Sequence, residues 1–125
     1  MGEEQIIYFF DSYAILEVIF GNPSYSNYSN IPFITTKLNL MEVHFSLLKL
    51  YGKKEADEYY DELVKFAINF EDEAIKFANE FKLKMKAKNL SYIDCLGYII
   101  AKLRGVKFLT GDKEFQDLEN VEFVK

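Results

Sequence analysis

The chain of 125 residues has the size of one domain, and we expect residues 1–125 to form a single domain. Hydrophobic residues make up 50% of the chain and charged residues 28%, a composition that excludes a disordered or low-complexity protein. The formal net charge of -5 argues against a protein that holds nucleic acid by a broad basic surface.

The chain contains one cysteine, Cys95, and one histidine, His44, which limits the kinds of site it can form. A lone cysteine forms no internal disulfide, and the pair argues against a zinc finger or a Ser-His-Asp triad. Cys95 lies in the apolar run 93–100, so we interpret it as a buried thiol, and His44 as an ordinary helix residue.

The N-terminal residues do not resemble a secretion signal, because acids stand where such a signal carries basic residues. No apolar run approaches the roughly 18 residues that a membrane span needs. We therefore expect a cytoplasmic protein with no membrane segment.

The first half of the chain predicts a buried strand followed by helices. The unbroken apolar run Ile6–Phe10 is typical of a central strand that is buried on both faces. Helical spacing follows over Ser12–Phe20, and Gly21 to Asn30 reads as a polar loop. Ile31–Thr35 is either a short strand or an extended entry to the next helix. That helix, Leu38–Tyr51, has an apolar repeat at Leu38, Met41, Phe45 and Leu48.

The second half predicts three helices and two further strands. Lys53–Phe70 and Glu71–Lys88 carry aromatic residues at helical intervals among charged ones, and Ser91–Arg104 is a third helix, ended by Gly105. Val106–Leu109 and Val121–Val124 read as strands. Strands separated by helices, without hairpin dipeptides, indicate an α/β fold with a central parallel sheet.

Two acids follow directly after predicted strands, where parallel α/β sheets place their functional crevice. Asp11 follows the first strand, and Asp112 follows the second with Thr110 two residues before it. If the extended geometry persists, Thr110 and Asp112 point to the same side. The structural alternative is that Asp11 caps the next helix and that Asp112 is a turn or cap residue.

Two more acids lie on apolar helices. Glu42 shares a helix row with Leu38 and Phe45, at the edge of the predicted apolar face. Asp94 opens a helix that is apolar nearly all round, and Ser91-x-x-Asp94 matches a capping box. The roles of cap and ligand do not exclude each other.

Four acids that approach the interior repel one another unless a cation lies among them. Carboxylates without histidine or cysteine suit Mg²⁺ or Mn²⁺, which keep waters and bind phosphates in their open positions. This ligand set indicates phosphodiester hydrolysis by a metal-activated water.

Four short segments, taken in order, resemble the PIN-domain nucleases, and in particular the VapC-like toxin ribonucleases of toxin–antitoxin pairs. The segments are Phe10-Asp11-Ser12, Leu40-Met41-Glu42-Val43, Leu90-Ser91-Tyr92-Ile93-Asp94, and Phe108-Leu109-Thr110-Gly111-Asp112 with Phe115 following. The resemblance spans almost the whole chain.

The resemblance implies a three-layer α/β/α sandwich in which Asp11, Glu42, Asp94 and Asp112 hold Mg²⁺ or Mn²⁺, with Thr110 in support. It also implies cleavage of an RNA substrate, a homodimer, and inhibition by an antitoxin protein. Two binding proteins stand as alternatives: a catalytically idle member of the same fold, serving as a scaffold in an RNA-processing complex, and a phosphate-sensing domain.

Three surface features admit both a structural and a functional interpretation. Tyr25 and Tyr28 in the polar loop either stack on unpaired bases or, as loop tyrosines usually do, pack on their own domain. The lysines at 82, 84, 86 and 88 are expected to spread around a solvated helix end. The acidic block 55–62 is either a solvated face or the rim of a surface for a basic antitoxin segment.

Overall fold

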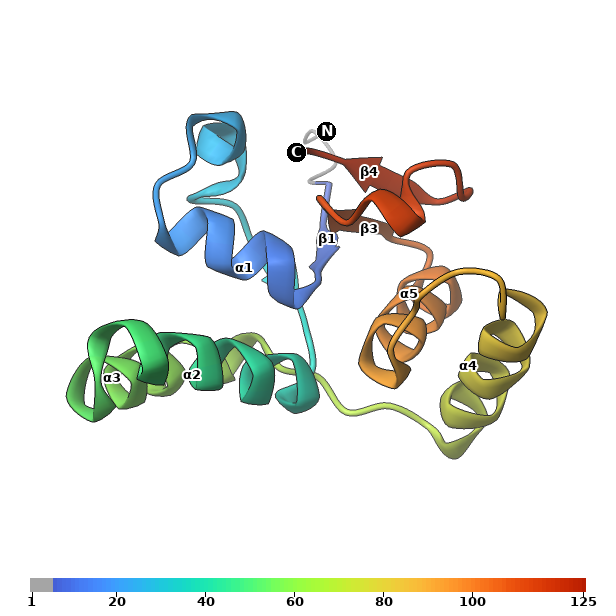
Figure 1. The fold of residues 1–125 in the computed structure, drawn as a ribbon, viewed down its shortest axis with the longest axis horizontal. Helices are drawn as coiled ribbons and strands as arrows, with labels where there is room; N and C mark the ends of the chain where they lie inside the picture. The colour runs from blue at the N-terminus through green and yellow to red at the C-terminus, as the bar shows by residue number, and fades with distance from the viewer. Residues whose placement is uncertain (1–5) are drawn as a thin grey trace, which may run out of the picture.

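The computed structural model describes residues 6–125, which form a four-stranded parallel sheet between two layers of helices (Figure 1). The strands lie in the order β2-β1-β3-β4, and every neighbouring pair is parallel. Their bounds are β1 Tyr8–Phe10, β2 Phe33–Ile34, β3 Lys107–Thr110 and β4 Val121–Phe123. The predicted α/β fold with a central parallel sheet is confirmed.

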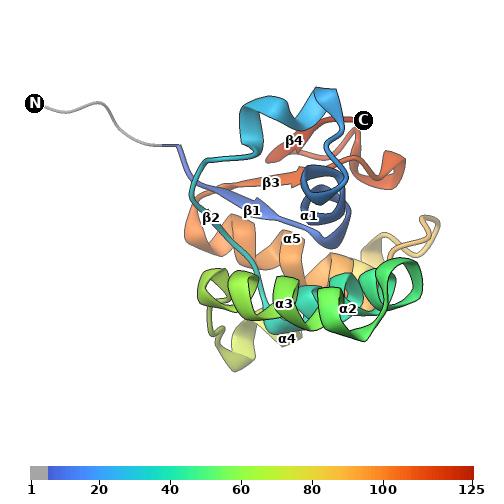
Figure 2. The same ribbon diagram turned by 90° about the vertical axis from the view of Figure 1, so that its left-hand side faces the viewer.

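Within the described part of the chain, five α-helices and three short 3-10 helices connect these strands. They are α1 Ser12–Ile19, η1 Pro23–Tyr28, α2 Lys37–Tyr51, α3 Lys53–Leu63, η2 Val64–Phe66, α4 Asp72–Lys84, α5 Tyr92–Arg104 and η3 Lys113–Phe115. Helices α1, α2 and α3 lie on one side of the sheet, and α4 and α5 lie on the other (Figures 1 and 2). This arrangement is the expected α/β/α sandwich. Within residues 6–125, no helix is both long and apolar enough to span a bilayer.

The strands are shorter than the apolar runs that predict them. Ile6 and Ile7 precede β1 and are 65% and 39% exposed, because the pairing of β1 with both neighbours begins at Tyr8. Strand β3 starts one residue later than predicted and includes Thr110. The segment 31–35 was expected to be either a short strand or an extended entry to the next helix. It contains the two-residue strand β2.

The two charged helices end earlier than predicted. Helix α3 stops at Leu63, and Ala67 forms a parallel bridge with Thr35 beside the sheet. Helix α4 stops at Lys84, so the lysines at 86 and 88 lie in the turn before α5 rather than on a helix. The predicted polar loop 21–30 contains η1, which begins at Pro23 and has Asn22 as its N-cap.

The predicted apolar face of α2 is wrong. Its buried residues are Asn39, Leu40, Val43 and Leu47. The residues expected to face the core, Leu38, Met41, Phe45 and Leu48, are between 37% and 59% exposed. Both sets repeat at helical spacing, so periodicity alone does not decide which set packs inward. Helix α2 therefore presents an apolar stripe on its outer side.

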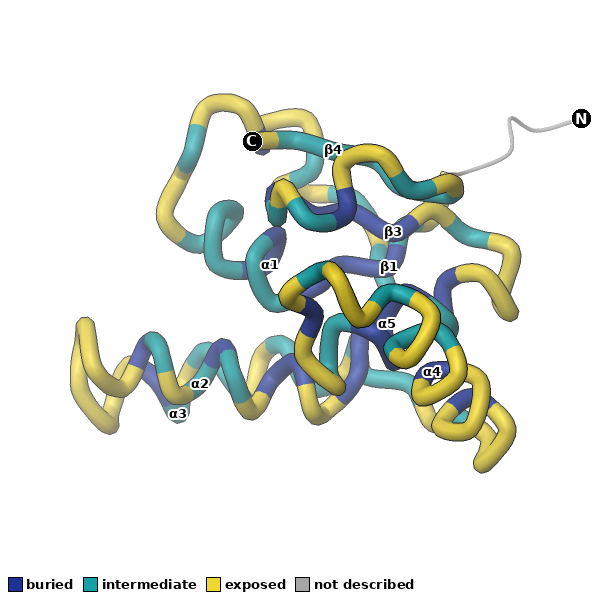
Figure 3. The backbone as a smooth tube through the Cα atoms, turned by 45° about the vertical axis from the view of Figure 1, so that its right-hand side comes forward, coloured by how far each residue is buried: buried dark blue, intermediate teal, exposed yellow. Residues whose placement is uncertain are grey.

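Aromatic rings fill the core on the α5 side of the sheet, and Figure 3 shows buried backbone in β1, β3 and part of α5. Phe9 of β1 stacks on Phe108 of β3 with 5.8 Å between ring centroids, and both side chains are fully buried. Gly97 of α5 faces these rings. A Cβ atom added there would lie 2.9 Å from Cε1 of Phe9 and 3.2 Å from Cε1 of Phe108. The missing side chain lets α5 lie close against the sheet.

We predict that Gly97→Ala destabilises the protein by about 1–3 kcal/mol, although alanine favours helix, because the packed rings cannot move aside. Urea unfolding of the variant and its parent measures the difference. Leu103→Ala, which truncates an exposed side chain of the same helix, is the control and should change the free energy of unfolding by less than about 0.5 kcal/mol. An unchanged or raised stability of Gly97→Ala would contradict the close packing.

Candidate functional site

Asp11 lies at the carboxyl end of β1 and is only 3% exposed. Its Oδ1 atom accepts a hydrogen bond of 2.8 Å from the backbone N–H of Ala14, so it is the N-cap of α1. Its Oδ2 atom accepts a hydrogen bond from the hydroxyl of Thr110, at the end of the neighbouring strand β3. The capping role is thus confirmed, and Asp11 also joins the ends of the two central strands.

Thr110 connects Asp11 to Asp112. While its hydroxyl donates to Asp11, its Oγ1 atom accepts from the backbone N–H of Asp112 at 3.0 Å. Asp112 in turn caps η3 by accepting from the N–H of Glu114 at 3.0 Å. The structure therefore brings these three predicted residues together at one edge of the sheet.

Glu42 reaches the same edge from α2. Its Oε1 atom accepts a hydrogen bond of 2.6 Å from the hydroxyl of Ser12, the residue that follows Asp11. Asn39 is buried and donates to the Ser12 oxygen at 3.2 Å, while its own Oδ1 accepts from Thr36 at 2.7 Å. This network fixes the start of α2 against the start of α1.

Asp94 is held at the first turn of α5. Its backbone N–H donates to Oγ of Ser91 at 3.0 Å, and its Oδ2 accepts from the N–H of Ser91 at 3.2 Å. The predicted capping box is therefore confirmed. Lys82 of α4 donates to the carbonyl oxygen of Leu90, next to this box.

The four carboxylates act on one another electrostatically. The pKa of Asp11 is raised to about 7: burial is the main cause and the negative charges of Asp94 and Asp112 add to it, while the hydrogen bonds from Thr110 and Ala14 act in the opposite direction. Burial also raises the pKa of Glu42, and Asp94 adds to that rise.

The pKa of Asp94 is raised by burial and by Asp112, whereas hydrogen bonds from Ser91 and the positive charge of Lys82 lower it. Lys82 is the one basic side chain in residues 6–125 that acts on the pKa of Asp11, Glu42 or Asp94. The site is therefore rich in negative charge and has little positive charge to balance it.

The chemistry of these side chains fits a hard divalent cation. All four acids provide oxygen, and Glu42, Asp94 and Asp112 each keep one carboxylate oxygen outside the hydrogen bonds of the described residues. Within residues 6–125, no group of three His, Cys, Asp or Glu side chains is arranged so that it could hold a metal ion. In this structure Asp11, Asp94 and Asp112 each direct one oxygen to a backbone N–H near the start of a helix, and Glu42 directs one to the hydroxyl of Ser12.

Ser12, Asn39 and Lys82 belong to this site but were not predicted from the sequence. Ser12 could have been predicted from its place directly after Asp11, because residues that follow a parallel strand lie at the same edge of the sheet. Asn39 and Lys82 gave no comparable signal. Each acts through a residue that is distant in the chain, and no local pattern reveals such a contact.

The remaining polar candidates have structural roles. Cys95 is buried, and burial raises the pKa of its thiol to about 11. His44 is a helix residue that pairs with Asp57 of α3 at 2.8 Å. The hydroxyl of Tyr25 donates to the carbonyl oxygen of Val124, and that of Tyr28 donates to Glu122 at 2.6 Å. Both tyrosines therefore hold η1 against the β4 end of the chain, as the structural interpretation expects.

A sequence model of one family, the PIN domain, matches residues 8–121. A search of the curated proteins finds no significant match.

Solved structures of toxins and toxin–antitoxin complexes share the fold. A toxin–antitoxin complex from Klebsiella pneumoniae aligns with a TM-score of 0.73 at 16% identity, over 94% of this chain and 96% of that chain. VapC20 of Mycobacterium tuberculosis, a toxin that cleaves the sarcin–ricin loop, aligns with a TM-score of 0.72 at 17% identity, over 95% of this chain and 99% of its own. VapBC2 of Rickettsia felis, bound to a promoter DNA fragment, aligns with a TM-score of 0.70 at 17% identity, over 96% and 100%.

We predict that Asp11→Asn stabilises the metal-free protein at pH 8 by about 1–3 kcal/mol, and that this gain disappears near pH 4. The carboxyl of Asp11 has a pKa of about 7 in the folded protein against 3.8 as a reference, so the folded state binds its proton more tightly. Stability is therefore lost as the pH rises through this window, and asparagine removes that loss while it still caps α1.

Urea unfolding between pH 4 and pH 8, with chelator present, measures the effect. Asp117→Asn, at an exposed position, is the control and should shift stability little at any pH. A stability difference between Asp11→Asn and its parent that does not vary with pH would contradict the assignment of a raised pKa to Asp11.

Proposed function

Because the chain belongs to the PIN domain family, we propose that it is a divalent-metal-dependent endoribonuclease. The observation that carries this proposal is the buried carboxyl of Asp11, whose pKa is raised by burial and by repulsion from Asp94 and Asp112. A folded protein keeps such a cluster of acids at some expense in stability, which a bound cation offsets.

Asp11, Glu42, Asp94 and Asp112 would hold Mg²⁺ or Mn²⁺. When bound, such an ion lowers the pKa of a water molecule and neutralises charge on the leaving oxygen of a phosphodiester. Thr110 keeps the Asp11 carboxylate oriented through its hydrogen bond, and Ser12 does the same for Glu42. Oxygens of these same four carboxylates that do not bind the ion would accept the proton from the attacking water.

We further propose that the protein is the toxin of a toxin–antitoxin pair and cuts RNA in the cytoplasm. Support comes from the structures that share its fold, which include a toxin that cleaves the sarcin–ricin loop and complexes with antitoxins. The exposed acids of α3, including Glu55 and Glu58 around Tyr59, would receive a basic segment of the antitoxin by charge complementarity.

A homodimer is the third part of the proposal. The outer stripe of α2, formed by Leu38, Met41, Phe45 and Leu48, exposes large apolar side chains that a single copy of the chain does not cover. Contiguous apolar surface of this kind is typical of a protein interface.

We predict that cleavage of single-stranded RNA requires Mg²⁺ or Mn²⁺ and stops in excess EDTA. Asp11→Asn should lower the cleavage rate by at least about 100-fold, because it removes a charged ligand. It should also reduce the rise in melting temperature that Mn²⁺ causes. Asp117→Asn is the matched control. RNA cleavage that persists in EDTA, by protein free of other nucleases, would contradict the mechanism, and no cleavage under any metal would favour the idle scaffold.

We predict a homodimer in solution at tens of micromolar protein, measured by sedimentation. Phe45→Glu should shift the protein toward the monomer, because it places a charge in the apolar stripe of α2. Leu103→Glu, on the exposed face of α5, should leave the dimer intact. A parent protein that sediments as a monomer would refute this part of the proposal.

A further inference from the structure

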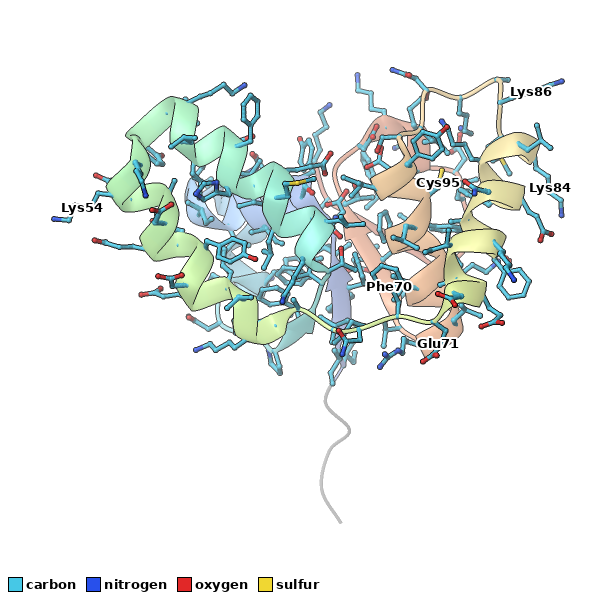
Figure 4. The ribbon with its side chains drawn as sticks, turned by 90° about the horizontal axis from the view of Figure 1, so that it is seen from below. Lys54, Phe70, Glu71, Lys84, Lys86 and Cys95 are labelled. Atoms are coloured by element: carbon cyan, nitrogen blue, oxygen red, sulfur yellow. The ribbon has the colours of Figure 1, made fainter. Side chains whose placement is uncertain are left out.

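A group of cations lies directly before the helix that carries Asp94. The seven residues 82–88 include four lysines and no acid, in a chain whose net charge is -5. Because α4 ends at Lys84, these lysines pass from the last turn of the helix into the turn that leads to α5. Figure 4 shows Lys84 and Lys86 at one end of the molecule, whereas Lys54 extends from the opposite end.

An exposed aromatic ring follows these lysines, at the start of the helix that carries Asp94. Tyr92 is the first residue of α5, two residues before Asp94, and it is 72% exposed. The ammonium group of Lys82 lies 4.9 Å from the centre of this ring and donates to the carbonyl oxygen of Leu90 at 2.5 Å. A tyrosine so exposed contributes little to the core. Lys82, which lies over its ring, is itself held in place by the hydrogen bond to the backbone of Leu90.

We propose that Lys82, Lys84, Lys86 and Tyr92 form a docking site for single-stranded RNA beside the acids. The ring of Tyr92 stacks on an unpaired base, and the ammonium groups contact the phosphates on either side of it. This inference rests on the proposed function, because it takes RNA as the substrate of the neighbouring acids, and it adds how the strand reaches them.

The local charge favours RNA over a protein partner at this place. A strand of RNA approaching four carboxylates is repelled unless cations near the site counter that repulsion. Lys82 already acts on Asp94, and Lys84 and Lys86 are exposed at the adjoining turn. The turn therefore gives this acidic protein a local group of positive charges, next in the chain to the helix that carries Asp94, which can attract phosphates.

Binding of a labelled single-stranded RNA of about 12 nucleotides, measured by fluorescence anisotropy in EDTA, tests the site without cleavage. Tyr92→Ala should weaken binding at least fivefold, whereas Tyr92→Phe, which keeps the ring, should stay within about twofold of the parent. Lys84→Ala combined with Lys86→Ala should reduce the slope of log affinity against log salt by about 1.4. Lys54→Ala is the control and should change neither the affinity nor the slope.

Three results would overturn the inference: a parent that does not bind the RNA, equal affinity of Tyr92→Ala and the parent, or a change of oligomeric state in Tyr92→Ala. The last would assign the ring to a protein interface. A parent that binds the RNA as described but cleaves none with added metal would refute the proposed nuclease and leave the docking site standing.

Discussion

The burial of one carboxyl group, that of Asp11, is the constraint on which the rest of the site depends. Its side chain is 3% exposed, and both oxygens accept hydrogen bonds, yet burial still raises its pKa to about 7. Hydrogen bonds offset part of the loss of water but supply no positive charge. The negative charges of Asp94 and Asp112 raise the pKa of Asp11 as well, so this edge of the sheet carries negative charge that few positive charges balance.

The register of the two central strands is what brings these groups together. Phe10 pairs with Leu109, and the backbone N–H of Asp11 donates to the carbonyl oxygen of Leu109 at 3.2 Å. The next residues along the strands, Asp11 and Thr110, consequently meet although they are 99 positions apart. A slip of one residue would turn Thr110 to the other face of the sheet. The packed aromatic core that fixes the register thus also fixes the site.

Much of this arrangement was predictable because the strands are buried on both faces. Their apolar runs end abruptly at Asp11 and Thr110, and parallel sheets bring such ends to one edge. The orientation of α2 was not predictable, since two apolar sets on it share the helical period and only the sheet decides between them. Asn39 was missed for a related reason, because its polar side chain is buried only through contacts with Ser12 and Thr36.

The caps explain how the fold keeps its acids in place. Asp11 and Asp112 are the N-caps of α1 and η3, and Asp94 is the third residue of α5. Each of the three accepts a hydrogen bond from a backbone N–H near the start of its helix. The amino-terminal ends of α1 and α5 carry partial positive charge, which favours a carboxylate beside them. Several helices start at the carboxyl edge of this parallel sheet, and their amino-terminal ends therefore hold several negative charges near one another. Capping and the metal binding that we propose use the same feature of the fold, so the structural role of these acids prepares the proposed catalytic one.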